Sequence, residues 1–276
     1  MPRFRKIVWA HYKKEGRHDL PWRPPTLKLQ RDKTLSLYPV LVSEIMLQQT
    51  QVERVVPLYK NFMKQFPTAK KLAAASLAEV LKSWQGLGYN RRAKMLHSAA
   101  KQLVVAGSNL AIARLEELSG VGPYTARAVA AFAYNQDVVV IETNIRTVII
   151  HHFFPKKKKV SDKEIEKVLI EVLPIGRARE WYSALMDYGA HLKRSGISHN
   201  ARSIGNVKQS KFAGSLREAR GAILRALSVK GDLPVTQTEL ESLLGPDRKL
   251  QVRAALAALC AEGMVAKRGR RYVLAD

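Results

Sequence analysis

A glycine turn followed by a proline constrains this chain more than any other feature of its sequence. The turn runs from Leu118 to Thr125 and reads Leu-Ser-Gly-Val-Gly-Pro-Tyr-Thr. Its two glycines allow a tight backbone reversal, and Pro123 suits the first turn of a new helix, which we expect to reach about Ala133. The pattern predicts a helix, a hairpin and a second helix. Because the first N–H groups of that second helix have no partners within it, they form a ready site for an anion.

The charge balance indicates what that anion is. The 276 residues include 47 Lys and Arg against 23 Asp and Glu, a formal net charge of +24. Because these basic residues are spread along the whole chain, we expect a folded basic surface that binds a polyanion such as DNA. A generally basic protein without a nucleic-acid partner is the alternative.

Cysteine content and the lack of long apolar runs exclude several classes of protein. The single cysteine, Cys260, rules out an internal disulfide and any cluster held by four cysteines of this chain. No apolar run approaches the roughly 20 residues of a membrane span, and residues 1–6 lack the apolar segment of a signal peptide. We therefore expect a cytoplasmic, nucleoid-associated protein with no membrane partner.

Most of the chain has the hydrophobic periodicity of helices, with no alternating pattern strong enough for a sheet. We expect helices at 4–14, 39–66 with a break near Pro57, 72–81, 92–105, 123–133, 144–154, 161–172 and 181–192. The body of the protein is therefore predicted to be all-α.

A polar, basic stretch after this body reads as a linker, which we place at 206–214. Beyond it we expect helices at 216–227, 236–244 and 248–261 and a small hairpin at 264–274. Three helices followed by a basic hairpin are the order of a winged helix-turn-helix. Arg248, Lys249 and Arg253 lie near the start of the third helix, where a recognition helix contacts DNA. A small protein-docking domain is the alternative.

Three motifs, in this order and at this spacing, resemble those of one enzyme family. They are Ser-Glu-Ile-Met-Leu-Gln-Gln-Thr-Gln-Val at 43–52, Trp-Gln-Gly-Leu-Gly-Tyr at 84–89 and the glycine turn at 118–125. Over residues 9–192 the chain resembles the helix-hairpin-helix DNA glycosylases, and among them the MutY-type adenine glycosylases.

The resemblance implies a mainly α fold, with two helical lobes and the active site between them. The glycosylase domain would span 1–205, with lobes of about 36–135 and of 1–35 with 136–205. The small winged-helix-like α+β domain would span 215–276 and stand where the family has a Nudix-like domain that recognises 8-oxoguanine.

Two carboxylates match the family's chemistry. Cleavage of the bond between a purine and deoxyribose needs a proton for the departing base and a negative charge beside the cationic sugar. Glu44 lies on an apolar helix, where burial raises a carboxyl pKa, and matches the family's general acid by resemblance. Glu142 stands where the family has the aspartate that stabilises the sugar cation, and Asn144 matches the asparagine beside it. The alternatives are a surface glutamate for Glu44 and a hydrogen-bonded structural carboxylate for Glu142.

Tyr124 bears on a second reaction. At this position the lyase branch of the superfamily, such as endonuclease III, has a lysine that forms a Schiff base with the sugar. Tyrosine has no amine for that step. The resemblance therefore implies a monofunctional glycosylase that leaves the DNA strand intact.

Side chains expected to contact DNA lie in the same three motifs. They are Gln48, Gln49, Thr50, Tyr89, Asn90, Arg91, Gly120, Val121 and Gly122. Amide and hydroxyl groups of the first three can read base edges, with an ordinary helix surface as the alternative. Asn90 stands where the family often has a second tyrosine that wedges into the duplex, which leaves the preferred opposite base open.

The sequence also departs from the family at its iron–sulfur loop. Residues 186–190 resemble the stretch that leads into this loop, but Lys193 stands where the first cysteine is expected. We therefore expect no iron–sulfur cluster and no metal centre, although the resemblance allows a monovalent cation at the hairpin. Basic Lys193, Arg194 and Arg202 are candidates for phosphate contact instead.

These features together predict a monomeric DNA glycosylase of base excision repair. It would flip a mispaired base out of double-stranded DNA and hydrolyse its glycosidic bond, with adenine opposite 8-oxoguanine or guanine as the first choice. A mismatch glycosylase for thymine, uracil or hypoxanthine is one alternative, and a non-catalytic DNA-binding protein is the other.

Overall fold

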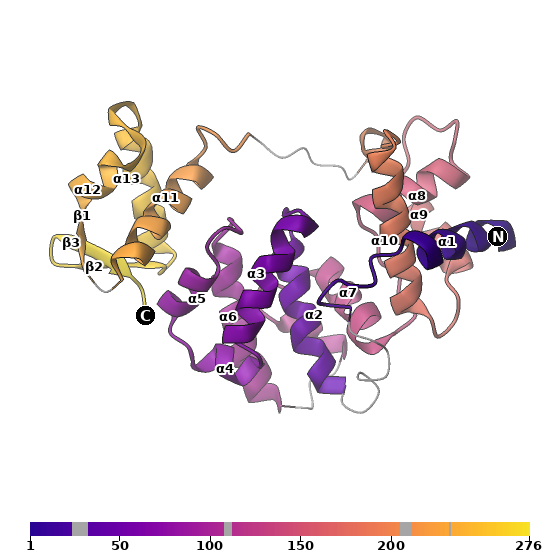
Figure 1. Ribbon diagram of the computed structural model, residues 1–276, viewed down its shortest axis with the longest axis horizontal. Helices are drawn as coiled ribbons and strands as arrows, with labels where there is room; N and C mark the ends of the chain where they lie inside the picture. Colours follow the sequence, from indigo (N-terminus) through magenta and orange to yellow (C-terminus); the bar gives the residue numbers. More distant parts are fainter. Residues whose placement is uncertain (24–32, 108–111, 205–210, 232) are drawn as a thin grey trace. The chain divides into compact units, whose positions relative to one another are not determined.

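The chain consists mainly of α-helices joined by short turns, as its periodicity predicts (Figure 1). The computed structural model describes residues 1–23, 33–107, 112–204, 211–231 and 233–276. Two parts of our predictions lie outside these residues, namely most of the loop after the first helix and residues 206–210 of the linker.

Two compact units make up the structure, each from two separate stretches of chain. The first unit is Met1–Glu44 with Val121–Lys208, and the second is Ile45–Gly120 with Gln209–Asp276. Helix α2 (Lys33–Leu47) begins in the first unit and ends in the second.

The first unit has one continuous hydrophobic core. Besides the start of α2, its helices are α1 (Pro2–Glu15), α7 (Pro123–Tyr134), α8 (Thr143–Phe153), α9 (Asp162–Val172), α10 (Ala178–Arg194) and the short 3-10 helix η4 (Asn200–Arg202). Trp181 and Tyr182 of α10 are fully buried in this core, and the ring of Phe4 meets Trp181 edge to face at 6.0 Å. We expected 121–135 to group with 36–120, whereas α7 packs on α10 and contributes buried alanines to this core.

The second unit begins with a helical part that corrects two predicted elements. Its helices are α3 (Val52–Gln65), α4 (Ala69–Ala74), α5 (Leu77–Ser83), α6 (Arg91–Ala106) and the 3-10 helix η3 (Ile112–Glu117). The single helix predicted at 72–81 is wrong, because Ser76 and Glu79 form a capping box that starts α5 after a break. The break predicted at Pro57 falls instead between α2 and α3, and Pro57 lies inside α3.

Helix α2 starts before the predicted position at Pro39, which lies inside the helix. A proline in a helix interior removes one backbone hydrogen bond. Burial of Leu37 and Tyr38, each 5% exposed, offsets that loss because the helix can extend its apolar face toward its start.

The C-terminal part of the second unit has the predicted order of helices and hairpin. Its elements are α11 (Leu216–Lys230), β1 (Val235–Thr236), α12 (Gln237–Glu241), the 3-10 helices η5 (Ser242–Leu244) and η6 (Pro246–Arg248), α13 (Lys249–Ala261), β2 (Val265–Arg268) and β3 (Arg271–Leu274). The hairpin of β2 and β3 turns at Gly269, whose φ of 63° suits glycine. Strand β1 was not predicted; it adds to the other edge of β3, so the antiparallel order is β1-β3-β2.

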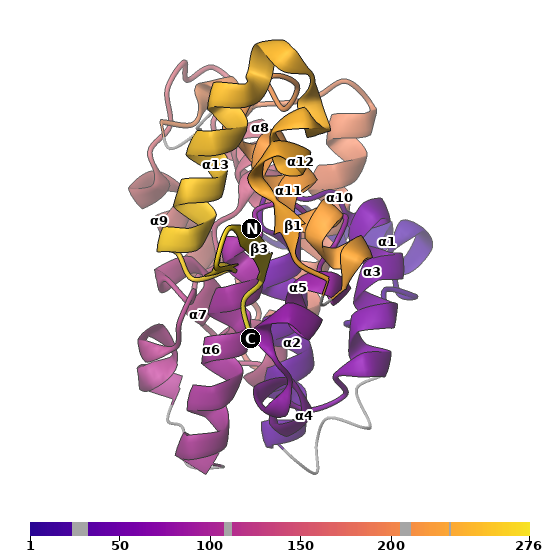
Figure 2. The same cartoon turned by 90° about the vertical axis from the view of Figure 1, so that its left-hand side faces the viewer.

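Helix α11 joins this C-terminal part to the rest of the second unit. It packs against α13 within the C-terminal part (Figure 2) and also against α5. The amide of Gln85 donates to the Ser228 hydroxyl at 3.3 Å, and the Lys94 ammonium donates to the Glu262 carbonyl oxygen. The two parts are therefore held together by α11 and by polar contacts on either side of it.

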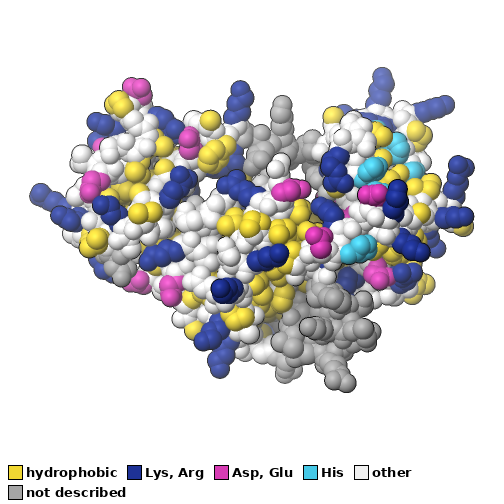
Figure 3. All heavy atoms as spheres, in the orientation of Figure 1, with side chains coloured by type: hydrophobic (Ala, Val, Ile, Leu, Met, Phe, Trp, Pro, Cys, Tyr) yellow, Lys and Arg dark blue, Asp and Glu magenta, His cyan; other side chains and the backbone are white. Residues whose placement is uncertain are grey.

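Basic side chains cover the surface as the composition predicts. Figure 3 shows Lys and Arg side chains scattered over the visible face, with acidic side chains among them, rather than gathered into one patch. Charge alone therefore does not locate a DNA-binding surface on this face.

Candidate active site

Glu44 is a buried carboxyl on the apolar face of α2. Its neighbours in the sequence, Ile45 and Met46, are fully buried, and Glu44 itself is 9% exposed. Burial raises the pKa of Glu44 to about 7, and the negative charge of Glu142 adds to this rise. A hydrogen bond from Tyr124 and the charge of Arg23 act in the opposite direction. The predicted rise of this pKa is therefore confirmed.

Tyr124 provides the hydrogen-bond donor for Glu44. It is the second residue of α7, where Pro123 starts the helix after the glycine turn. Desolvation of the Tyr124 hydroxyl raises its pKa well above its usual range, and the charges of Glu44 and Glu142 raise it further, although 38% of the residue as a whole is exposed. The hydroxyl therefore keeps its proton at neutral pH and donates a hydrogen bond to the Glu44 carboxyl.

Glu142 is the N-cap of α8. Its Oε1 accepts hydrogen bonds from the backbone N–H groups of Asn144 at 2.8 Å and Ile145 at 2.9 Å. Its Oε2 accepts from the Thr143 hydroxyl at 3.2 Å and from the Asn144 amide at 3.3 Å. For Glu142 the sequence left open the alternative of a hydrogen-bonded structural carboxylate. These four hydrogen bonds agree with that alternative. The same contacts fix a negative charge at a helix N-terminus, where the helix dipole favours it.

Gly189 allows α10 to approach this N-terminus closely. A Cβ atom at Gly189 would lie 2.4 Å from the Asn144 carbonyl oxygen, which is closer than side chains tolerate. The glycine of the 186–190 motif is therefore required by packing against the residue that holds Glu142. The family resemblance had linked the 186–190 motif only to the iron–sulfur loop.

Asp187, in the same motif, organises the segment that precedes α2. Its carboxylate accepts from the Arg17 guanidinium at 2.7 Å and from the Arg23 guanidinium at 2.7 and 3.1 Å, and only 1% of its side chain is exposed. Burial alone would raise the pKa of Asp187, but the hydrogen bond and charge of Arg23, with the charge of Arg17, hold it below its usual value. The sequence did not reveal this cluster, because Asp187 lies more than 160 residues from both arginines along the chain.

Two cations act on the same site. Arg146 of α8 forms an ion pair with Asp162 at 2.7 Å, and its charge also acts on Glu142 and Tyr124. Lys193 is half-buried near the end of α10, and burial lowers its pKa while the charge of Glu142 opposes this effect. Lys193 thus interacts electrostatically with Glu142, which we did not predict.

Protein contacts occupy Arg202, which we had considered for DNA phosphate. Its guanidinium donates to the carbonyl oxygens of Phe154, Pro155 and Lys157. The backbone N–H of Val160 also donates to the Arg202 carbonyl oxygen at 2.8 Å. Because these bonds tie two loops of the first unit together, Arg202 has a structural role.

In the second unit, Arg92 holds together the two turns that carry predicted DNA contacts. Its two terminal nitrogens share their four N–H groups among six acceptors at 2.5 to 3.2 Å, and these acceptors lie in both turns and in the end of α2. The acceptors are the carbonyl oxygens of Ile45, Met46, Gln48, Leu87 and Gly88 and the Thr50 hydroxyl. Burial lowers the pKa of Arg92 to about 10, so it stays charged at neutral pH. We did not predict this role for Arg92, because the sequence cannot show where a buried guanidinium donates.

The predicted DNA contacts at these turns differ in exposure. Gln49 and Tyr89 have positive φ values of 59° and 45°, which are uncommon for residues other than glycine. Arg91 is exposed, whereas Asn90 is 8% exposed and starts α6. Burial of Asn90 argues against a wedging role for it.

The glycine turn itself has two kinds of glycine. Gly120 has a φ of 80°, and a Cβ there would lie 2.8 Å from the Met95 side chain, so both conformation and packing require glycine. Gly122 is the N-cap of α7, and a Cβ there would meet nothing within 4 Å. Val121 between them is buried. Space is therefore open beside Gly122, where we predicted an approaching phosphate.

The predicted recognition helix α13 has fewer available cations than its sequence indicates. Arg248 pairs with Glu218 at 2.8 Å, and Arg253 pairs with Glu241 at 2.6 Å. Only Lys249 of the three predicted contacts is exposed without such a pair among the described residues. DNA contact by α13 remains a prediction, and these ion pairs count against it.

Neither a metal site nor a membrane-spanning helix is found among the described residues. No group of three or more His, Cys, Asp or Glu side chains among them could hold a metal ion. None of the helices within the described ranges has the length and apolar character needed to cross a membrane.

Comparison with known proteins identifies the class to which this site belongs. Residues 42–174 match the family model of the HhH-GPD superfamily base excision DNA repair protein. An adenine DNA glycosylase of Mycolicibacterium smegmatis is 36% identical over 269 residues, which cover 91% of this chain and 88% of that protein. An adenine DNA glycosylase of Mycobacterium tuberculosis is 34% identical over 280 residues, which cover 94% of this chain and 88% of that protein. The chain therefore belongs to the HhH-GPD superfamily and, within it, to the family of the adenine DNA glycosylases.

Solved structures confirm the predicted fold. A thermostable thymine-DNA glycosylase superposes with a TM-score of 0.55 at 23% identity, over 68% of this chain and 87% of that one. A trapped endonuclease III–DNA covalent intermediate superposes with a TM-score of 0.52 at 17% identity, over 70% of this chain and 84% of that one.

Proposed function

We propose that this chain is a monofunctional adenine DNA glycosylase that acts on adenine mispaired with 8-oxoguanine or guanine in double-stranded DNA. The observation that carries the proposal is the pairing of two unlike carboxyl groups, Glu44 buried with a pKa of about 7 and Glu142 capping α8. The names and identities of the relatives support adenine as the excised base. We further propose that the protein acts as a monomer.

Glu44 is proposed as the general acid. At neutral pH a large fraction of its carboxyl groups holds a proton, because burial disfavours the ionised form. It donates this proton to a ring nitrogen of the flipped adenine, so the bond between that base and the sugar C1′ breaks and adenine leaves as a neutral molecule. Tyr124 orients the Glu44 carboxyl through its hydrogen bond.

Glu142 is proposed to stabilise the positive charge that develops on the sugar. Its four hydrogen bonds hold the carboxylate in one orientation before the reaction starts. Water then adds to C1′, and the deprotonated Glu44 takes up the proton that this water releases, which restores the enzyme. The product is an abasic site in an intact strand.

Absence of lyase activity is also a proposal. Tyr124 cannot form a Schiff base, and the amine with an electrostatic link to the site is that of Lys193. Sodium borohydride should therefore trap no covalent complex between the protein and DNA. If a complex forms, and Lys193→Gln abolishes it, the chain is a lyase that uses Lys193.

Excision assays test the main proposal. Duplexes with adenine opposite 8-oxoguanine, guanine or cytosine, and with uracil, thymine or hypoxanthine mispairs, are incubated with the protein and developed with and without alkali. We expect breaks only after alkali, only at adenine, and none with Glu44→Gln. Glu171→Gln removes an exposed carboxylate on α9 and serves as the matched control. Tight binding without excision on any duplex would show that the proposed function is wrong.

A further inference from the structure

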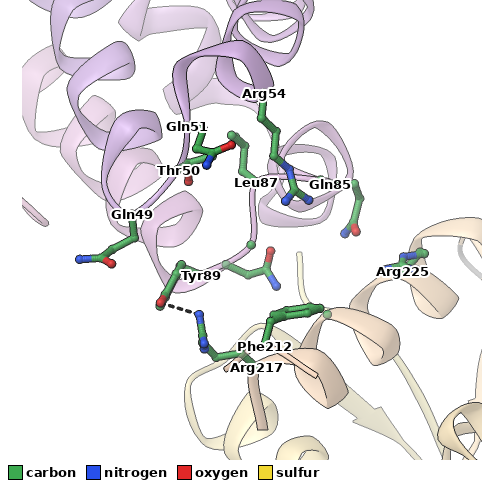
Figure 4. A pocket seen from close by; sticks show the side chains of 14 residues that line it. Gln49, Thr50, Gln51, Arg54, Gln85, Leu87, Tyr89, Phe212, Arg217 and Arg225 are labelled. Carbon is green, nitrogen blue, oxygen red and sulfur yellow. Dashed lines mark hydrogen bonds between the residues drawn. The ribbon is translucent and has the colours of Figure 1, made fainter. Parts of the chain in front are cut away.

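A pocket within the second unit lies between the two turns held by Arg92 and helix α11. Its volume is about 380 Å³. Its lining consists of Gln49, Thr50, Gln51, Arg54, Gln85, Gly86, Leu87, Gly88, Tyr89, Asn90, Phe212, Arg217, Gly221 and Arg225 (Figure 4). Three of these side chains are guanidiniums and none is a carboxylate, so the pocket favours an anionic ligand. Amides and two aromatic rings complete a lining suited to a nucleotide.

Arg217 connects α11 directly to the turn at Tyr89. Its guanidinium donates to the Tyr89 hydroxyl at 2.6 Å, and its charge lies 5.0 Å from the centre of the Tyr89 ring (Figure 4). It also lies 5.9 Å from the ring of Phe212. Arg217 therefore fixes Tyr89, so the C-terminal part of the unit helps to shape this wall of the pocket.

Arg54 and Arg225 leave their charges available. Both are exposed, and neither guanidinium forms a hydrogen bond or ion pair with any other residue that the structure describes. In Figure 4 the side chain of Arg54 extends from α3 along the side of the pocket, and Arg225 lies on α11. Other arginines of this unit, such as Arg248 and Arg253, are paired with glutamates. Two unpaired guanidiniums at one pocket are suited to a phosphate group.

Gly221 lies on the same face of α11, four residues after Arg217 and four before Arg225. Glycine is unfavourable in a helix interior compared with alanine. Neither of the usual reasons for glycine holds, because its φ is not positive and a Cβ would meet nothing within 4 Å. A Cβ at Gly221 would therefore project into open space, and the residue also lines the pocket.

We propose that the Arg217–Gly221–Arg225 face of α11, with Arg54, binds a backbone phosphate and its nucleotide in the DNA strand opposite the excised base. The proposal rests on the proposed function. Gln49 follows Glu44 by five residues in the sequence, so the pocket adjoins the segment that takes the flipped base. Removal of that base from the duplex leaves its partner nucleotide behind, beside Gln49 and Tyr89. Helix α11, and not α13, is then the DNA-contacting helix of the C-terminal part.

Binding measurements with matched variants test the site. Affinity for a duplex with adenine opposite 8-oxoguanine is measured by fluorescence anisotropy at several salt concentrations, in a Glu44→Gln background that prevents excision. Arg54→Gln and Arg225→Gln should each weaken binding about tenfold and reduce the slope of log affinity against log salt by about 0.9. Arg114→Gln is the control, because Arg114 belongs to the same unit but pairs with Glu117. Equal binding by all three variants would overturn the proposal.

Gly221 provides a test that changes no charge. Gly221→Leu places a side chain in the open space of the pocket, so it should weaken binding without lowering the melting temperature. Gly221→Ala should raise the melting temperature and weaken binding less than leucine does. Unchanged affinity of the leucine variant would contradict an approach of DNA to this face.

Uncharged phosphate analogues in the DNA identify which strand the pocket binds. Methylphosphonates are placed one at a time in either strand, near the mispair, and binding is compared between the parent and Arg225→Gln. One methylphosphonate in the 8-oxoguanine strand should weaken DNA binding by the parent protein. The same methylphosphonate should have little further effect on binding by Arg225→Gln. A response confined to the adenine strand would overturn the strand assignment. Because these assays measure DNA binding and not excision, they test the pocket separately from the proposed function. They give a result even if no duplex is cleaved.

Discussion

Replacement of Glu44 by glutamine is expected to stabilise the folded protein at alkaline pH while it abolishes excision. Glutamine has nearly the same shape as glutamate, and its amide oxygen can still accept the hydrogen bond from Tyr124. What it lacks is the ability to ionise. The substitution therefore isolates the free energy that the folded protein loses when a buried carboxyl is forced to carry a charge.

The size and sign of this effect follow from the pKa. The pKa of Glu44 rises from 4.5 to about 7 on folding, which corresponds to roughly 3 kcal/mol at about 1.4 kcal/mol for each pKa unit. Because the folded pKa is the higher one, the stability that the neutral carboxyl contributes is fully present below pH 4.5. It is lost as the pH rises to about 7. Relative to the parent, Glu44→Gln should gain roughly 2 to 3 kcal/mol between pH 5 and pH 8.

Urea denaturation at the two pH values measures this gain. Unfolding can be followed by tryptophan fluorescence, because Trp181 of the first unit and Trp84 of the second are both fully buried. Other titrating groups affect both proteins alike and cancel in the difference between variant and parent. Glu171→Gln, on the surface of α9, controls for the loss of one negative charge from a basic protein. A constant difference between Glu44→Gln and the parent from pH 5 to pH 8 would refute the reasoning.

Further measurements test how the site around Glu44 is held. Single-turnover excision should fall about tenfold per pH unit above about pH 7, and an increase there would exclude Glu44 as the acid. Tyr124→Phe removes a bond that lowers the pKa of Glu44, so this alkaline decline should move to higher pH; an unchanged profile would contradict that bond. Gly189→Ala should destabilise the fold by about 2 kcal/mol in urea, because its Cβ would meet Asn144, and unaltered stability would show that α10 can shift. Asp187→Asn leaves two guanidiniums without their charge partner and should cost roughly 3 kcal/mol, whereas a loss below about 1 kcal/mol would show that solvent replaces it.

Local signals in the sequence predicted most elements and the residue types of the site. Helix α6, helix α9 and the hairpin of β2 and β3 lie close to their predicted ranges. One error also has a local origin, since the capping box at Ser76 and Glu79 divides a stretch that its apolar residues alone make look continuous. The motif containing Glu44 and the raised pKa of that residue followed from an apolar helix and a family resemblance.

What the sequence could not give is which charged side chains are already paired. Arg248 and Arg253 resemble free DNA contacts along the chain, but both are paired with glutamates in the fold. Arg217 and Arg225 drew no attention, yet they face a pocket together with a turn more than 120 residues earlier. Pairing depends on which helices pack together, and helix periodicity contains no information about that choice.

The sequence by itself determined that the chain is helical, basic and equipped with two carboxylates in the order of a DNA glycosylase. Only the tertiary structure decided that Glu142 caps a helix, that Gly189 lets α10 reach it, and that Asp187 holds the segment before α2. The physical reason is distance along the chain. Caps, turns and apolar faces arise from residues a few positions apart, whereas close approaches and buried charge pairs join residues that only the packed core brings together.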